Sequence, residues 1–202
     1  MSMRQSREEK ARTHERIVDI ASARIREAGI AGPGVAEIMQ AAGLTHGGFY
    51  KHFGSRDDLI AEAVDRAFAD SNRTMRELTD DAEDPLAAYV DWYVSTRHRD
   101  DPANGCPVVA LGGDVRRGDE RARAAFRRRV ERYLADFESL LGGGEDARRR
   151  ATVAVSTLVG AVLLARAVDD EALSDQILSD VRGALKRSLS VDSHPSTGRP
   201  DD

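Results

Sequence analysis

Apolar residues recur three or four positions apart along most of the chain, and short breaks separate the helices that this spacing predicts. The first such pattern covers residues 12–28 and ends at Gly29. Two shorter helices are predicted over residues 35–42 and 45–53, with Gly43 between them. Two short helices joined by a tight glycine turn indicate a helix-turn-helix.

The helical pattern continues to about residue 189. Ser55, followed by two acidic residues, predicts a helix from 55 to about 78. Asp84 and Cys106 each precede a proline, a pattern typical of helix starts. The further helices are expected from 85 toward 96, from 106 onward, from 118 or 119 to 141, over 145–168 and over 171–189, with a polar loop at 97–105.

Composition supports an all-α fold, because Ala and Arg, two residues of high helix propensity, are the most frequent in the chain and aromatic residues make up only 5% of it. We expect a three-helix helix-turn-helix domain over residues 1–54 and a larger helical domain over 55–189, linked by the helix at 55–78. The tail, 190–202, is rich in Ser, Pro, Gly and Asp, which predicts disorder.

Charge is distributed unevenly along the chain. The net charge is -5, but residues 1–54 contain eight basic and six acidic residues, a net +2, so the remainder carries about -7. A basic segment on an acidic body is typical of a protein that turns one end toward DNA. Many solvated helices show a similar basic excess, so charge alone does not decide the function.

Cys106 is the only cysteine, which excludes an intramolecular disulfide and a cysteine-rich metal site. The longest run without charge, residues 151–165, is shorter than the roughly 20 residues of a membrane-spanning helix. The polar N-terminus does not look like a signal peptide. We therefore expect a cytoplasmic protein without a metal, a cofactor or a membrane partner.

The segment 41–56 carries the most specific signal. Gly47 and Gly48 lie inside a predicted helix, where each glycine costs roughly 1 kcal/mol relative to alanine. Close approach of this helix to another molecular surface would explain why glycine is present at both positions. Phe49 and Phe53 are spaced to pack inward, while the polar side chains between them suit phosphates or base edges. The same pattern would fit a polar surface helix with two incidental glycines.

The sequence from about residue 12 to residue 59 resembles the N-terminal domain of the TetR (tetracycline-repressor-like) family of bacterial transcriptional regulators. Residues 13–17 resemble the opening helix of that domain, and residues 35–43 resemble the first helix of its motif. Residues 45–53 resemble its recognition helix, and residues 54–59 resemble the start of its fourth helix.

The resemblance implies roles for individual residues. Positions that usually hold phosphates are occupied by Thr45, Tyr50, His52 and Arg56; positions that vary with the operator are occupied by His46, Gly48 and Lys51; and Gly47 matches the usual glycine. Three features depart from the family pattern: Pro33-Gly34 replaces a Ser or Thr cap, Ala36 replaces a frequent Arg, and Gly48 replaces a hydroxyl residue. Sequence readout is therefore expected from Gln40, His46 and Lys51.

By the same resemblance, the protein is expected to be a homodimeric repressor that binds a palindromic operator in double-stranded DNA and releases it on binding a small effector. We place the dimer interface on the helices at 145–168 and 171–189, because their apolar faces exceed what one thin bundle would bury. A monomeric core is the alternative interpretation of these faces.

An effector pocket typically combines aromatic walls with a few polar groups. The candidates on the helix near residue 90 and in the loop that follows it are Tyr89, Trp92, Tyr93, Arg97, His98 and Cys106. Ordinary core packing at helical spacing would produce the same pattern.

Three further interpretations differ from the ligand-responsive repressor. A helix-turn-helix activator, or a DNA-binding factor without a ligand, is compatible with the sequence. Cys106 at a helix N-cap could sense oxidants or electrophiles, or could be a small buried apolar residue. An enzyme would need Cys106 as nucleophile with His98 and Asp114 as its partners, but no nucleophile motif surrounds the cysteine, so we expect no enzyme.

Overall fold

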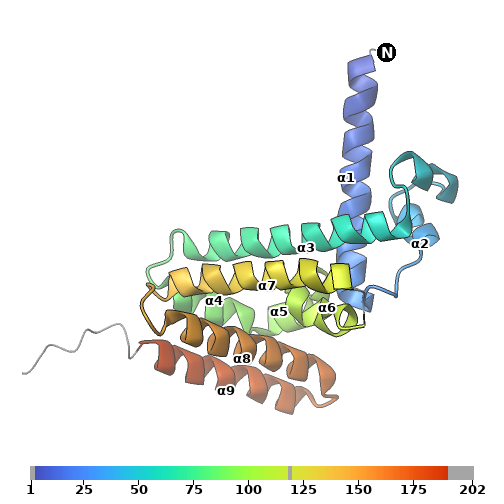
Figure 1. Ribbon diagram of the computed structural model, residues 1–202. Coiled ribbons are helices and arrows are strands. Elements are labelled where there is room, and N and C mark those ends of the chain that lie inside the picture. The colour runs from blue at the N-terminus through green and yellow to red at the C-terminus, as the bar shows by residue number, and fades with distance from the viewer. Residues whose placement is uncertain (1–2, 118–119, 191–202) are drawn as a thin grey trace, which may run out of the picture. The chain divides into compact units, whose positions relative to one another are not determined.

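The computed structural model describes residues 3–117 and 120–190, and in these ranges the secondary structure is helical, without a strand (Figure 1). The predicted all-α fold class is confirmed. The long helices are α1 (Met3–Ala28), α3 (Arg56–Thr79), α7 (Glu120–Leu140), α8 (Ala147–Ala167) and α9 (Glu171–Ser190). The short ones are α2 (Val35–Ala41), η1 (His46–Lys51), α4 (Pro85–Tyr93), α5 (Thr96–Asp100), η2 (Pro102–Asn104) and α6 (Pro107–Val115).

The chain forms two compact units. The first contains the described residues up to Glu77 and those from Asp100 to Glu131. The second contains Leu78–Arg99 and the described residues from Arg132 onward. Neither unit ends at residue 54, and the functional boundary expected there stays a prediction. The expected disordered tail falls almost entirely outside the described residues.

The core of the first unit joins the helix-turn-helix to α1, α3 and α6. Its fully buried members include Ile17 of α1, Ile38 of α2 and Leu111 of α6. Phe49 and Phe53 are 2% and 3% exposed, so the prediction that they pack inward is confirmed. This core fixes the inner face of η1 and leaves its other face to solvent.

Helix α1 begins nine residues before the apolar pattern does, at Met3 instead of residue 12. The added turns are rich in Arg, Gln, Glu and Lys, which have high helix propensity and need no buried partner to stay helical. The apolar pattern in the sequence therefore indicates only the part of α1 that packs against the core.

The predicted helix starts at Ser55, Asp84 and Cys106 are confirmed. Ser55 Oγ accepts from Asp58 N at 3.1 Å, and Asp84 Oδ1 accepts from Ala87 N at 2.9 Å. Cys106 is the N-cap of α6. Two predictions were wrong in detail: the helix from residue 85 ends at Tyr93, and the supposed polar loop at 97–105 contains α5 and η2.

In the second unit α8 packs against α9, and both contact α4. The prediction that α8 is buried over most of its circumference is wrong for the single chain. One face, including Leu158 and Val162, is buried, but Val153, Leu163 and Leu164 are more than half exposed. The pattern of small and apolar residues therefore marks two apolar faces, of which the single chain covers one.

The length and the mean hydropathy of 1.4 would allow α8 to cross a membrane, and it is the one such helix among the described residues. Core helices of soluble proteins have the same properties. One face of α8 packs on α9 and α4, which accounts for the apolar residues of that face.

Candidate nucleic-acid interface

The turn between α2 and η1 depends on Gly43. Its φ of +70° lies in the left-handed region, which a residue with a Cβ rarely adopts. Gly43 N donates to Gln40 O at 2.9 Å, and Leu44 N donates to Met39 O at 2.8 Å. These bonds satisfy the last carbonyls of α2 and turn the chain sharply into η1.

The recognition segment is shorter and tighter than predicted. Residues 45–53 were expected to form one helix, but a 3₁₀-helix covers His46–Lys51 only. Thr45 is its N-cap by backbone geometry, without a side-chain capping bond. Two adjacent glycines weaken an α-helix, and 3₁₀ geometry is common in such short pieces.

Neither glycine of η1 is required by the fold of the free protein. A Cβ on Gly47 would meet nothing within 4 Å, and a Cβ on Gly48 would lie 3.5 Å from Met39 Cε, an ordinary contact. Neither residue has a positive φ. The surface above these glycines is therefore open, as close approach of a partner would require.

The residues predicted to contact DNA lie on the outer side of this motif. Tyr50 is 72% exposed, and its ring meets the buried Phe49 edge-on at a centroid distance of 5.3 Å. The exposed members of the predicted set are Gln40, Thr45, His46, Gly47, Tyr50 and Lys51, and the half-buried members are Gly48, His52 and Arg56.

Arg56 has partners within the protein. Its Nη2 donates to Ile30 O at 2.5 Å and to Pro33 O at 3.3 Å. These bonds hold the loop before α2, whose N-cap, Gly34, has no side chain to cap the helix. The structure thus gives Arg56 a structural contact that the resemblance to the family did not imply.

His52 lies at the C-terminal end of η1, and its Nδ1 is buried without a hydrogen-bond partner. Burial lowers the pKa of His52, and the nearby His14, Lys10 and Lys51 lower it further. No role for His14 was predicted from the sequence. The signal was available, since His14 lies three and seven residues before the buried Ile17 and Ala21, and therefore on the same face of α1.

Arg26 is an interior residue, although it contributes to the basic charge of residues 1–54 in the sequence. It is 5% exposed, and its Nε donates to Ser22 O at 3.1 Å. Its Nη1 donates to Gly105 O at 3.4 Å, and its Nη2 lies 3.5 Å from Asp70 Oδ2. Burial lowers the pKa of Arg26, and Asp70 opposes that shift. Arg26 thus ties α1 to α3 and to the segment before α6.

Four of the predicted effector residues form an aromatic cluster in the second unit. The Trp92 ring stacks on His98 at a centroid distance of 4.6 Å, and Tyr93 meets His98 edge-on at 4.7 Å. His98 Nδ1 lies 2.6 Å from Tyr93 O, which places the Nδ1 proton on that bond. The hydroxyl groups of Tyr89 and Tyr133 are 2.9 Å apart.

The other two predicted effector residues lie apart from the cluster's ring contacts. Arg97 is exposed on α5. Cys106 is 2% exposed and belongs to the first unit, at the N-cap of α6.

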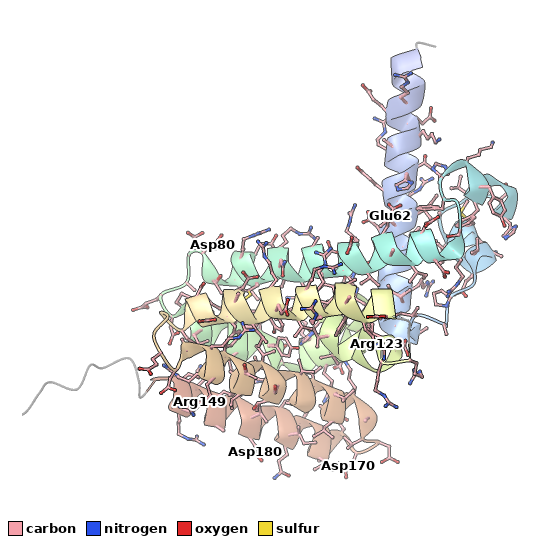
Figure 2. The ribbon with its side chains drawn as sticks, in the orientation of Figure 1. Glu62, Asp80, Arg123, Arg149, Asp170 and Asp180 are labelled. Carbon is pink, nitrogen blue, oxygen red and sulfur yellow. The ribbon has the colours of Figure 1, made fainter. Side chains whose placement is uncertain are left out.

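A hollow of about 480 Å³ in the second unit was not expected from the sequence. It lies between the beginning of α8, where Figure 2 labels Arg149, and the end of α9. Arg150 Nη2 donates to Leu189 O at 3.4 Å at its edge. Its lining residues are Asp146, Arg149, Arg150, Val153, Ala154, Leu185, Ser188 and Leu189. Within the described ranges, no group of three or more His, Cys, Asp or Glu side chains is placed to hold a metal ion.

Comparison with known proteins agrees with this geometry. Residues 17–63 match the family model "Bacterial regulatory proteins, tetR family". An uncharacterized HTH-type transcriptional regulator of Mycobacterium tuberculosis, Rv0196, is 32% identical over 187 residues, which cover 87% of this chain and 95% of the relative. The HTH-type transcriptional repressor DhaR of a Mycobacterium species is 24% identical over 59% of this chain and 61% of its own length.

Solved structures show the same fold. A TetR transcriptional regulator from Chloroflexus aurantiacus superimposes with a TM-score of 0.78 at 24% identity, covering 91% of this chain and 96% of that one. The helix-turn-helix, the family match across it and the relative that spans nearly the whole chain lead to one conclusion. The chain belongs to the TetR family and is a DNA-binding transcriptional regulator.

Proposed function

We propose that the protein is a homodimeric repressor that binds a palindromic operator and releases it when a small effector binds to its helical body. The observation that carries the DNA-binding part is the outer face of η1. Exposed polar side chains surround two glycines there, and the fold of the free protein does not require glycine at either position.

On this proposal, η1 enters the major groove, and Gly47 and Gly48 let its backbone approach the bases. Gln40, His46 and Lys51 are exposed and can reach base edges. Thr45, Tyr50 and His52 would bind phosphates, which set the register without reading sequence. Arg56 would act indirectly, by holding the loop that begins α2.

The uncovered face of α8 supports a homodimer. Val153, Gly160, Leu163 and Leu164 recur at helical spacing on the side opposite the buried face, and the three larger side chains are 53–59% exposed. Leu173 of α9 is 45% exposed. Contiguous apolar surface of this kind marks an interaction site, and a second copy of the same helices would cover it.

The aromatic cluster of Tyr89, Trp92, Tyr93 and His98 is the proposed place for an effector. Aromatic walls with few polar groups are typical of small-molecule sites. In a regulator without a ligand, the same residues would only form part of the hydrophobic core.

The relative DhaR is named a repressor, which favours repression over activation. The family consists of bacterial regulatory proteins, which supports a cytoplasmic location.

The test starts with the full-length protein and a random-sequence duplex library, from which bound DNA is selected and sequenced. We expect an inverted repeat whose half-sites are one helical turn apart, about 34–36 Å. Light scattering should give twice the chain mass of 22.0 kDa. Selected DNA without two-fold symmetry, or a monomer bound to DNA, would contradict the proposal.

A further inference from the structure

Two histidines from different elements lie together at the end of the recognition segment. The rings of His14 on α1 and His52 after η1 have centroids 6.0 Å apart. The His14 ring also stacks on Phe53 at 4.5 Å. Its Nε2 lies 2.7 Å from Glu62 Oε2, and Figure 2 labels Glu62 on the part of α3 beside α1. The first unit therefore holds a cluster of titratable groups where α1, η1 and α3 meet.

The cluster is cationic around His52. Lys10 is exposed one helical turn before His14, on the same face of α1, and Lys51 is exposed at the end of η1. Burial is the main reason why the pKa of His52 is lowered, and His14, Lys10 and Lys51 lower it further by charge repulsion. The acid in contact with the cluster is Glu62, which is bonded to His14. The acid of α2, Glu37, is exposed in the first turn of that helix.

Burial, together with these neighbours, lowers the pKa of His52 below the ordinary histidine value, which favours the neutral ring at neutral pH in the free protein. Its Nδ1 is buried without a partner, so the fold leaves part of the hydrogen-bonding capacity of the ring unused. A negative charge beside Lys10 and Lys51 would remove the repulsion that opposes protonation.

We propose that Lys10, Lys51 and His52 together bind one DNA phosphate, and that His52 takes up a proton from solvent as the phosphate binds. This inference rests on the proposed DNA-binding role of η1 and adds two features to it. The first is a phosphate contact from α1, which the sequence analysis did not include. The second is a coupling between DNA affinity and pH.

The coupling has a definite sign. The phosphate raises the proton affinity of His52, and by linkage a higher proton concentration raises the affinity for DNA. Histidine is the side chain that changes charge near neutral pH, so the effect should fall between about pH 6 and pH 8. Uptake of one full proton changes affinity about tenfold per pH unit, so an average uptake of about half a proton over that range corresponds to a roughly tenfold change in affinity.

The experiment measures binding of the full-length protein to a random-sequence duplex and to the selected operator, at constant ionic strength and several pH values. We expect the affinity of the parent protein to rise as pH falls, and the affinity of His52→Gln to be nearly independent of pH. Calorimetry in two buffers of different ionisation enthalpy should show proton uptake by the parent protein, and less by the variant.

His46→Gln is the matched control, because His46 is the exposed histidine at the opposite end of η1. This variant is expected to keep the pH dependence, even if its affinity falls. Loss of the pH dependence in His46→Gln, with its retention in His52→Gln, would overturn the proposal.

Lys10→Gln tests the α1 contact without touching the core. It should weaken binding to all sequences and reduce the salt slope by about one. Arg12→Gln removes an exposed charge about 200° around the same helix and should leave the slope unchanged. Equal salt slopes for Lys10→Gln and the parent protein would refute the contact.

The failure of this inference can be distinguished from the failure of the proposed function. A parent protein that binds DNA independently of pH refutes this inference alone, whereas a parent protein that selects no DNA sequence refutes the proposed function.

Discussion

The carboxylate of Asp114 on α6 accepts a hydrogen bond from the backbone N–H of Ile30, with an N to Oδ2 distance of 2.7 Å. Asp114 also pairs with Arg117. Gly29, with a φ of +79°, places Ile30 in reach, and a Cβ on Gly29 would lie 2.6 Å from the same carboxylate oxygen. In the enzyme hypothesis, Asp114 would be a partner of the catalytic residues. In the structure it instead connects the end of α1 to α6.

Asp114→Ala should therefore destabilise the protein, because it leaves the N–H of Ile30 without its partner. We expect a loss of about 1–3 kcal/mol in the free energy of unfolding, measured by chemical denaturation. Asp169→Ala, at an exposed acid after α8, is the control and should change stability by less than about 0.5 kcal/mol. Equal stability of Asp114→Ala and the parent protein would contradict the structural role.

Leu164→Glu should break the proposed dimer without unfolding the chain, because Leu164 is 55% exposed in the single chain. A carboxylate in an apolar interface loses its hydration without gaining a partner. We expect a monomer by light scattering and operator affinity reduced by at least about tenfold, since each half-site then binds alone. The control is Ser179→Glu, which changes an exposed residue on a face of α9 outside the proposed interface. This variant should remain dimeric. A dimeric Leu164→Glu would place the interface elsewhere.

Trp92 can report on the effector site, because it is the only tryptophan and its ring stacks on His98. A small molecule that binds the aromatic cluster should both raise the melting temperature and change the emission of Trp92. Trp92→Phe should weaken binding of that molecule while keeping the operator affinity of the free protein. A stabilising ligand that leaves Trp92 emission unchanged would point to another site, such as the hollow between α8 and α9.

The lowered pKa of His52 also predicts how stability depends on pH. The unfolded chain has a histidine pKa of about 6.5, above that of the folded protein, so the unfolded state binds more protons between the two values. Stability is therefore full above about pH 6.5 and falls as pH decreases below that value. His52→Gln should show a weaker decrease in denaturation experiments between about pH 7.5 and pH 5. An identical pH dependence in both proteins would contradict the prediction.

Cys106 should behave as a core residue. It is 2% exposed at the N-cap of α6, in the segment where Arg26 bonds to Gly105 O. We expect slow alkylation in the folded protein and a rapid reaction after denaturation, with operator binding by Cys106→Ser close to that of the parent protein. Rapid alkylation of the folded protein, with release of DNA by electrophiles in the parent but not in Cys106→Ser, would instead support a sensor.

Local signals in the sequence were enough to predict most elements of the fold. The caps at Ser55 and Asp84, the turn at Gly43 and the inward packing of Phe49 and Phe53 depend on neighbours within a few residues. Spacing also identified α8 as strongly apolar, but it could not show that its two faces have different surroundings, because burial depends on which helices pack where. The helix-turn-helix was the easier part of the site to predict, since its signal lies in one short segment.

The contacts that the sequence did not predict join residues far apart in the chain. Arg56 reaches Ile30, Arg26 reaches Gly105, and His14 reaches Glu62. The spacing of His14 from Ile17 and Ala21 places it on the core side of α1, but nothing in the local pattern distinguishes Arg26 and Arg56 from basic residues available to DNA. Their roles follow from tertiary packing, which buries Arg26 and places backbone carbonyl groups where the Arg56 side chain can donate hydrogen bonds to them.

A methyl group would fit at both Gly47 and Gly48, so the free protein does not need glycine at these positions, whereas the proposed complex with DNA does. Where the native backbone suits alanine and nothing obstructs its methyl group, replacing glycine stabilises a protein by about 0.4–1 kcal/mol. Selection for stability alone would therefore remove both glycines. On the proposed function, the unbound domain is therefore less stable than its fold allows. Random mutation followed by selection for heat resistance should change these two positions early, at the expense of operator binding.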